Sequence, residues 1–75
     1  MRKILKLKII EHFDSQERFS TILQRLGVPG VDATLISRII RQHRDPTPPQ
    51  AAAFVELLHT PIDQLMKGDD NYYVV

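Results

Sequence analysis

Apolar side chains recur at helical spacing in five segments of the chain. Leu5, Ile9 and Phe13 are four residues apart, which predicts a first amphipathic helix over Lys3–Phe13. Similar stripes follow in four later segments: Phe19, Ile22, Leu23 and Leu26; Leu35, Ile36, Ile39 and Ile40; Ala51, Phe54, Val55 and Leu58; and Ile62, Leu65 and Met66. We therefore expect an all-α domain of four or five short helices, with these stripes directed into its core.

The second and third predicted helices are preceded by residues that commonly cap helices. Asp14 would place Glu17 at the third helical position, as in a capping box, although Ser15 can cap the second helix instead. Gly27 follows the last apolar residue of the second stripe and is expected to end that helix. Asp32 precedes the third stripe and is expected to cap the third helix.

The fourth predicted helix has the strongest start signal. Thr47 stands at the cap position, Pro48 follows at the first helical position, and Gln50 lies three residues after the cap. Thr60 and the proline after it repeat this pattern. We therefore expect Thr60 to cap a short fifth helix, which Gly68 ends.

The last residues of the chain differ in composition from the helical segments. Residues 72–75 are two tyrosines and two valines, and this composition is strand-like. We expect residues 1–68 to form one domain and residues 69–75 to form a C-terminal tail, which is either disordered or a dimer contact.

The composition narrows the class of protein. The 75 residues suffice for one domain, and 43% hydrophobic with 25% charged residues is ordinary for a globular protein. No apolar run approaches the roughly 18 residues that cross a bilayer, and Lys6 and Lys8 interrupt the N-terminal apolar stretch, unlike a signal peptide. The absence of cysteine excludes disulfides. We expect a cytoplasmic protein that does not associate with membranes.

The net charge of +1 conceals an uneven distribution along the chain. Residues 1–44 carry a formal charge of +5, whereas residues 45–75 carry −4. A basic half beside an acidic half suggests one surface for a polyanion. The alternative is that a small domain distributes its charges unevenly by chance.

The sequence offers little support for an enzyme. No phosphate-binding loop or nucleophile motif is present, and His12, His43 and His59 lie in separate segments without metal-ligand spacing. Each histidine is interpreted as a surface or boundary residue. We expect no catalytic activity, no cofactor, no bound metal and no small-molecule substrate.

The outer face of the third predicted helix carries the candidate chemistry. Thr34, Ser37, Arg38 and Arg41 lie away from its apolar stripe, and residues 33–44 contain three arginines and no acid. A helix fits the major groove of DNA, where one arginine can bond guanine twice while others bind phosphates. The alternative is a solvated amphipathic helix whose arginines only contribute solubility.

Several segments follow one another in an order and spacing found in a known family. They are residues 11–16 (EHFDSQ) with Phe19 and Ser20, residues 30–39 (GVDATLISRI), residues 44–47, residues 49–51, Leu57 with Leu58, and residues 60–65. Together they resemble the helix-turn-helix domains of the Cro/phage-repressor (XRE-like) superfamily, and are particularly similar to small Cro-like and YdaS-type proteins of bacterial prophages. The resemblance covers about residues 3–67 and implies a lambda-repressor-like fold.

Two features depart from the family pattern. The spacing from Gln16 to Ile36 is roughly six residues longer than is usual for the helix-turn-helix, with the additional residues at 24–29. We expect a longer second helix and a longer connection to the third. Ile40 stands where the family often has a polar residue, so it either deepens the core or belongs to an interface.

The resemblance also implies a DNA-binding site and a function. It implies base contacts at Asp32, Ala33, Thr34, Ser37 and Arg38, and phosphate contacts at Gln16, Arg41, Arg44 and Thr47. The implied function is sequence-specific regulation of transcription, as a repressor, by a homodimer that inserts the helix near residues 32–43 into the major groove of double-stranded DNA. The alternative is a protein-binding helix-turn-helix module, such as an antitoxin or a phage regulator that acts on another protein.

Overall fold

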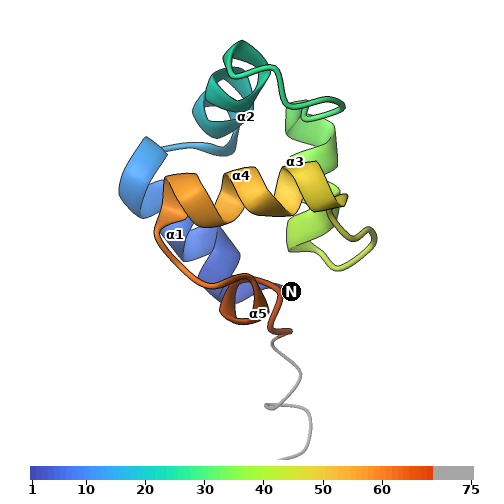
Figure 1. Ribbon diagram of the computed structural model, residues 1–75. Helices are drawn as coiled ribbons and strands as arrows, with labels where there is room; N and C mark the ends of the chain where they lie inside the picture. The colour runs from blue at the N-terminus through green and yellow to red at the C-terminus, as the bar shows by residue number, and fades with distance from the viewer. Residues whose placement is uncertain (69–75) are drawn as a thin grey trace, which may run out of the picture.

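The computed structural model describes residues 1–68, which form an all-α domain (Figure 1). Its helices are α1 (Lys3–Phe13), α2 (Gln16–Arg25), α3 (Ala33–Ile40), α4 (Pro48–Leu58) and α5 (Ile62–Leu65). The predicted fold class is confirmed. The strand-like tail predicted for residues 69–75 lies outside the described residues.

The helices are arranged around α1 and α4. In Figure 1, α4 crosses the middle of the molecule, with α2 above it, α3 at its right-hand end and α5 below it. α1 lies behind α4 in this view and contacts each of the other four helices. The chain can therefore build a single core against one face of α1.

The core contains apolar side chains from every helix. The buried apolar residues are Leu5, Ile9, Phe19, Leu23, Val31, Ile36, Ile39, Ile40, Phe54, Leu58 and Leu65. The Phe19 ring lies 5.1 Å from the Phe13 ring and 5.4 Å from the Phe54 ring, measured between centroids, so aromatic contacts join α1, α2 and α4. Ile40 is among the buried residues, which places it in the core.

One predicted core residue is wrong. Leu26 belongs to the second apolar stripe, but 61% of it is exposed. The reason is that α2 ends at Arg25 and Gly27 adopts φ of 80°, so the chain leaves the helix before Leu26 can face the core. Of residues 24–29, the first two therefore lie in α2 and the other four lie in the connection to α3.

The caps of α2 and α3 follow local sequence signals. Ser15 caps α2, because its hydroxyl accepts a hydrogen bond from the Arg18 backbone N–H at 3.1 Å. Asp14 instead ends α1 with φ of 70° and forms an ion pair with the Arg18 side chain at 3.1 Å. Asp32 caps α3 as predicted, accepting from the Leu35 backbone N–H at 2.7 Å.

The two expected proline-containing starts have different outcomes. The capping box of α4 is confirmed, since Thr47 accepts from the Gln50 backbone and the Gln50 side chain accepts from the Thr47 backbone. The prediction that Thr60 caps α5 is wrong. Pro61 occupies the cap position, while the buried Thr60 hydroxyl donates to the Leu58 carbonyl oxygen at 2.9 Å.

The third helix is shorter than the predicted span of residues 32–43. It ends at Ile40, and the His43 backbone N–H donates back to the Arg38 carbonyl oxygen at 2.9 Å. Gln42 adopts φ of 65°, the left-handed conformation in which glycine usually ends a helix of this kind. Residues 41–44, with two of the three arginines, are therefore part of the connection to α4.

Arg2 supplies hydrogen-bond donors to the end of α3. The last carbonyl groups of a helix lack partners within the helix and need donors from elsewhere. The Arg2 backbone N–H donates to the Ile40 carbonyl oxygen at 2.6 Å, and its guanidinium group donates to the Ile39 carbonyl oxygen at 2.9 Å. Two donors from the start of the chain thus satisfy the end of α3.

The same guanidinium group holds two further segments. It donates to the carbonyl oxygens of Arg44 at 3.0 Å and Met66 at 3.2 Å, and it forms an ion pair with Asp45 at 2.6 Å. Only 7% of Arg2 is exposed. Arg2 therefore belongs to the interior, although the sequence counts it among the positive charges of the basic half.

Replacing Arg2 by alanine should lower the free energy of unfolding by about 2–3 kcal/mol, because buried carbonyl oxygens lose charged donors. Arg2→Lys should recover only part of this loss, since an ammonium group cannot reach several acceptors as a planar fork does. Urea denaturation followed by circular dichroism measures both effects. The exposed Lys3→Ala substitution is the control, and equal stability of the Arg2→Ala and Lys3→Ala proteins would contradict the role of Arg2.

Candidate nucleic-acid interface

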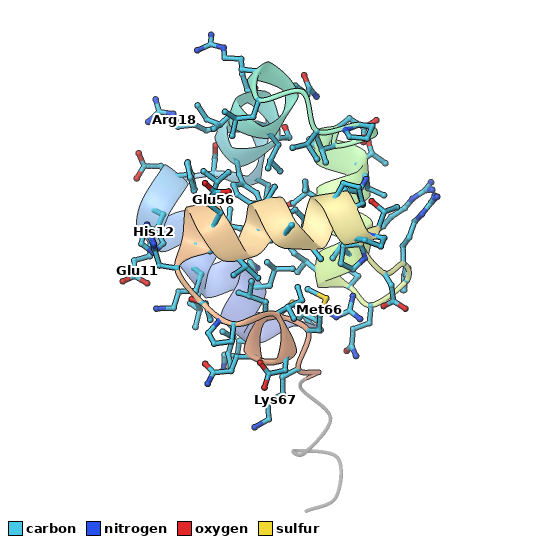
Figure 2. All side chains as sticks on the ribbon, in the orientation of Figure 1. Glu11, His12, Arg18, Glu56, Met66 and Lys67 are labelled. Atoms are coloured by element: carbon cyan, nitrogen blue, oxygen red, sulfur yellow. The ribbon has the colours of Figure 1, made fainter. Side chains whose placement is uncertain are left out.

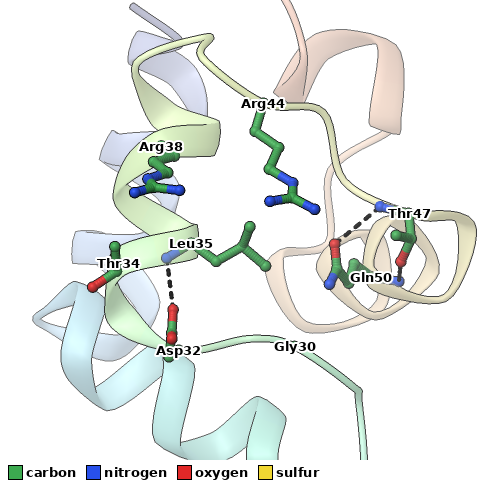
Figure 3. A pocket seen from close by; sticks show the side chains of 8 residues that line it. All are labelled: Gly30, Asp32, Thr34, Leu35, Arg38, Arg44, Thr47 and Gln50. Atoms are coloured by element: carbon green, nitrogen blue, oxygen red, sulfur yellow. Dashed lines mark hydrogen bonds between the residues drawn. The ribbon is translucent and has the colours of Figure 1, made fainter.

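An open cleft of about 310 Å³ lies between the start of α3 and the start of α4 (Figure 3). Its lining consists of Gly30, Asp32, Thr34, Leu35, Arg38, Arg44, Thr47 and Gln50. Five of the nine residues expected to contact DNA are in this lining, and they come from three separate parts of the chain. The fold therefore brings together residues that the sequence places up to 15 positions apart.

Gln50 sets the geometry of one wall of the cleft. Its side-chain Nε2 donates to the Pro29 carbonyl oxygen at 2.8 Å, while its Oε1 accepts from the Thr47 backbone N–H at 2.9 Å. Gly30 adopts φ of 72°, and a Cβ atom added there would lie 3.4 Å from Gln50 Nε2. The buried Gln50 side chain thus joins the start of α4 to the connection before α3.

Two arginines face the cleft without an acidic partner. Arg38 extends from α3 and Arg44 from the connection after it, and in Figure 3 both lie on the same side of Leu35. Within residues 1–68, neither forms an ion pair. The two nearest acids in the sequence form no ion pair with these arginines, because Asp32, which lines the same cleft, caps α3 and Asp45 binds Arg2. The guanidinium groups are therefore available to an external anion.

The other four predicted contact residues lie outside the cleft lining. Arg41 is exposed and directly follows the last residue of α3. It forms no ion pair within residues 1–68. Ala33 and Ser37 are half-buried on α3. Gln16 is half-buried at the start of α2, next to the acidic Glu17. Their roles in binding stay predictions.

Sequence reasoning missed three lining residues. The apolar pattern places Leu35 in the core stripe and the capping pattern explains Gln50, while no pattern assigns a role to Gly30. Leu35 is half-buried, so one part of it packs inward and another forms the apolar base of the cleft. The one local sign that another segment approaches closely here is Gly30, three residues before α3. The sequence does not indicate that the approaching residue is Gln50.

Two of the three histidines, His12 and His59, lie close together in the structure. His12 lies in the last turn of α1 and His59 follows the last residue of α4, and their ring centroids lie 5.9 Å apart on a side of the molecule away from α3 (Figure 2). Residues 1–68 contain no group of three or more histidine, cysteine, aspartate or glutamate side chains that could hold a metal ion. None of the described helices is both long and apolar enough to cross a membrane.

No protein-family model matches the chain, and the comparisons with curated proteins and with solved structures found no match either. The case for a function therefore rests on the residues of the cleft and on the charges around it.

Two substitutions of Asp32 test whether its side chain stabilises the protein by capping α3. Asp32→Ala should lower the free energy of unfolding by about 1 kcal/mol, because the Leu35 backbone N–H loses its acceptor. Asp32→Ser should cost only a few tenths, since serine is an equally good cap without the charge. Urea denaturation of both variants measures the difference. If Asp32→Ser and Asp32→Ala destabilise the protein equally, Asp32 does not stabilise it by capping α3.

Proposed function

We propose that this protein is a sequence-specific regulator of transcription that binds double-stranded DNA and represses by occupying its operator. The observation that carries the proposal is the pair of exposed arginines, Arg38 and Arg44, which face one cleft without an acidic partner in residues 1–68. Arg41 adds a third unpaired cation at the end of α3. Three such charges around one helix suit a polyanion.

The length and composition of α3 favour the major groove. Its eight residues form a rod about 12 Å long, and the groove admits a helix of this width. Thr34 and Arg38 are four residues apart, one turn along the same face. A threonine hydroxyl and an arginine fork are suitable groups for base edges, and Arg38 is the residue we assign to guanine.

The early end of α3 divides the arginines between two roles. Arg38 stays on the helix and can follow it into the groove. Arg41 and Arg44 lie at or beyond the helix end, where the chain turns towards α4. Side chains on such a turn suit the phosphate backbone, which contributes affinity and orientation rather than sequence information. The protein would bind as a homodimer to a near-palindromic site with half-sites about 34 Å apart.

Titration of the protein with a pool of random duplexes, at about 50 mM and about 200 mM salt, tests the proposal. We expect a steep loss of affinity with salt and enrichment of a two-fold symmetric motif in the retained DNA. Arg38→Ala should cost about 1–3 kcal/mol of binding free energy and relax the preference at one base pair. Arg41→Ala should weaken binding to all sequences alike and reduce the salt slope by about one unit.

Lys67→Ala is the matched control, because it removes a positive charge beyond α5, at the far end of the molecule from α2 (Figure 2). It should leave both the motif and the salt slope unchanged. Failure to retain DNA at the lower salt concentration would contradict the proposal and favour the protein-binding alternative. An equal loss for Arg38→Ala and Lys67→Ala would mean that net charge, rather than the cleft, attracts the DNA.

A further inference from the structure

Two exposed histidines from distant parts of the sequence meet where α1 and α4 end. His12 lies in the last turn of α1, and His59 directly follows the last residue of α4. Their ring centroids are 5.9 Å apart, and neither imidazole forms an ion pair within residues 1–68. The sequence shows no metal-ligand spacing for either residue, but the fold places the two imidazoles beside each other.

The backbone beneath each ring is held by the core. His59 lies between Leu58 and Thr60, which are both buried, and it adopts φ of 52°. Residues other than glycine seldom adopt this left-handed conformation. His12 precedes Phe13, which packs against the hydrophobic core. The fold therefore fixes the two backbone positions, while the exposed rings are free to rotate.

The charges around the histidines favour a cation. Glu11, next to His12 in the sequence, and Glu56, three residues before His59, lie at the same side of the molecule as His12 (Figure 2). Lys8 binds Glu11 at 3.4 Å, whereas Glu56 is exposed and forms no ion pair within residues 1–68. The carboxylate of Glu56 thus contributes uncompensated negative charge near the pair of imidazoles.

We propose that His12 and His59 together bind one divalent transition-metal ion of the kind that imidazole prefers, namely zinc, copper(II) or nickel(II). A zinc–nitrogen bond is about 2.0–2.1 Å long, so two imidazoles on one tetrahedral ion have ring centroids about 5 Å apart. A small rotation of the two exposed rings closes the observed separation to this value. Water supplies the remaining ligands, because no group of three or more suitable side chains exists within residues 1–68.

This site is separate from the arginine cleft. The cleft lies at the start of α4 and His59 follows its end, and the 11 helical residues between them span about 16 Å. The two sites share no residue. Metal binding by the histidines therefore does not depend on DNA binding, and it can be measured on the protein alone.

Urea denaturation with and without zinc chloride tests whether one ion joins the two histidines. An ion held by both residues binds only the folded chain and stabilises it, whereas an ion held by one histidine binds the unfolded chain equally well. We expect zinc to raise the urea midpoint of the wild-type protein, and a chelator to reverse the rise. The rise should be absent in His12→Asn and in His59→Asn. Asparagine is suitable at position 59 because it tolerates positive φ.

His43→Asn is the matched control, because His43 is exposed in the connection between α3 and α4. It should keep the full rise of the urea midpoint. Each variant is compared with itself in the absence of zinc, so a change in its intrinsic stability does not affect the result. No rise in the wild-type protein, or a rise that survives His12→Asn or His59→Asn, would overturn the proposal.

Calorimetric titration with zinc chloride gives an independent readout. We expect one ion per chain, with a dissociation constant that rises about tenfold or more in His12→Asn and in His59→Asn, and that stays unchanged in His43→Asn. The double variant should bind no more weakly than either single variant, because the chelate is already lost when one imidazole is removed. Independent, additive losses would show two separate weak sites and reject the shared ion.

Discussion

The structure depends on the set of hydrogen bonds that Arg2 makes. One side chain and one backbone N–H, both at the start of the chain, hold the end of α3, the connection after it and the residue that follows α5. A charge can remain in an interior only when its donors are satisfied, and Arg2 combines three carbonyl acceptors with the Asp45 carboxylate. Segments that lie far apart in the sequence are thereby fixed relative to one another.

The shape of the arginine cleft follows from this constraint together with Gln50. Arg2 fixes one end of the connection that carries Arg44, while Gln50 fixes the loop before α3 against the start of α4. Both ties are made by polar side chains that are at least nine-tenths buried. Hydrogen bonds from Arg2 and Gln50 therefore fix two sides of the cleft, and Leu35 forms its apolar base.

The features that could be predicted from the sequence depend on residues that are close together in the chain. The helix caps at Asp32 and Thr47 depend on groups three residues away, and the apolar stripes repeat within each helix, so both could be predicted without knowledge of the fold. The error at the end of α3 arose where a distant residue, Arg2, competes with local signals, whereas the Thr60 hydroxyl is taken by the Leu58 carbonyl oxygen only two residues before it. No local pattern distinguishes Arg2 from a surface arginine, because its acceptors lie 37 to 64 residues away. The shared cleft was likewise not predictable, although five of its lining residues had been selected one by one.

The sequence separation of the Arg2 contacts also bears on the order of folding. Capped helices close loops of a few residues, whereas the Arg2 contacts close loops of 37 to 64 residues and carry a larger entropic cost. They form only after the helices that they join have met. We therefore expect the connection between α3 and α4 to be the last part of the cleft to take its final shape during folding.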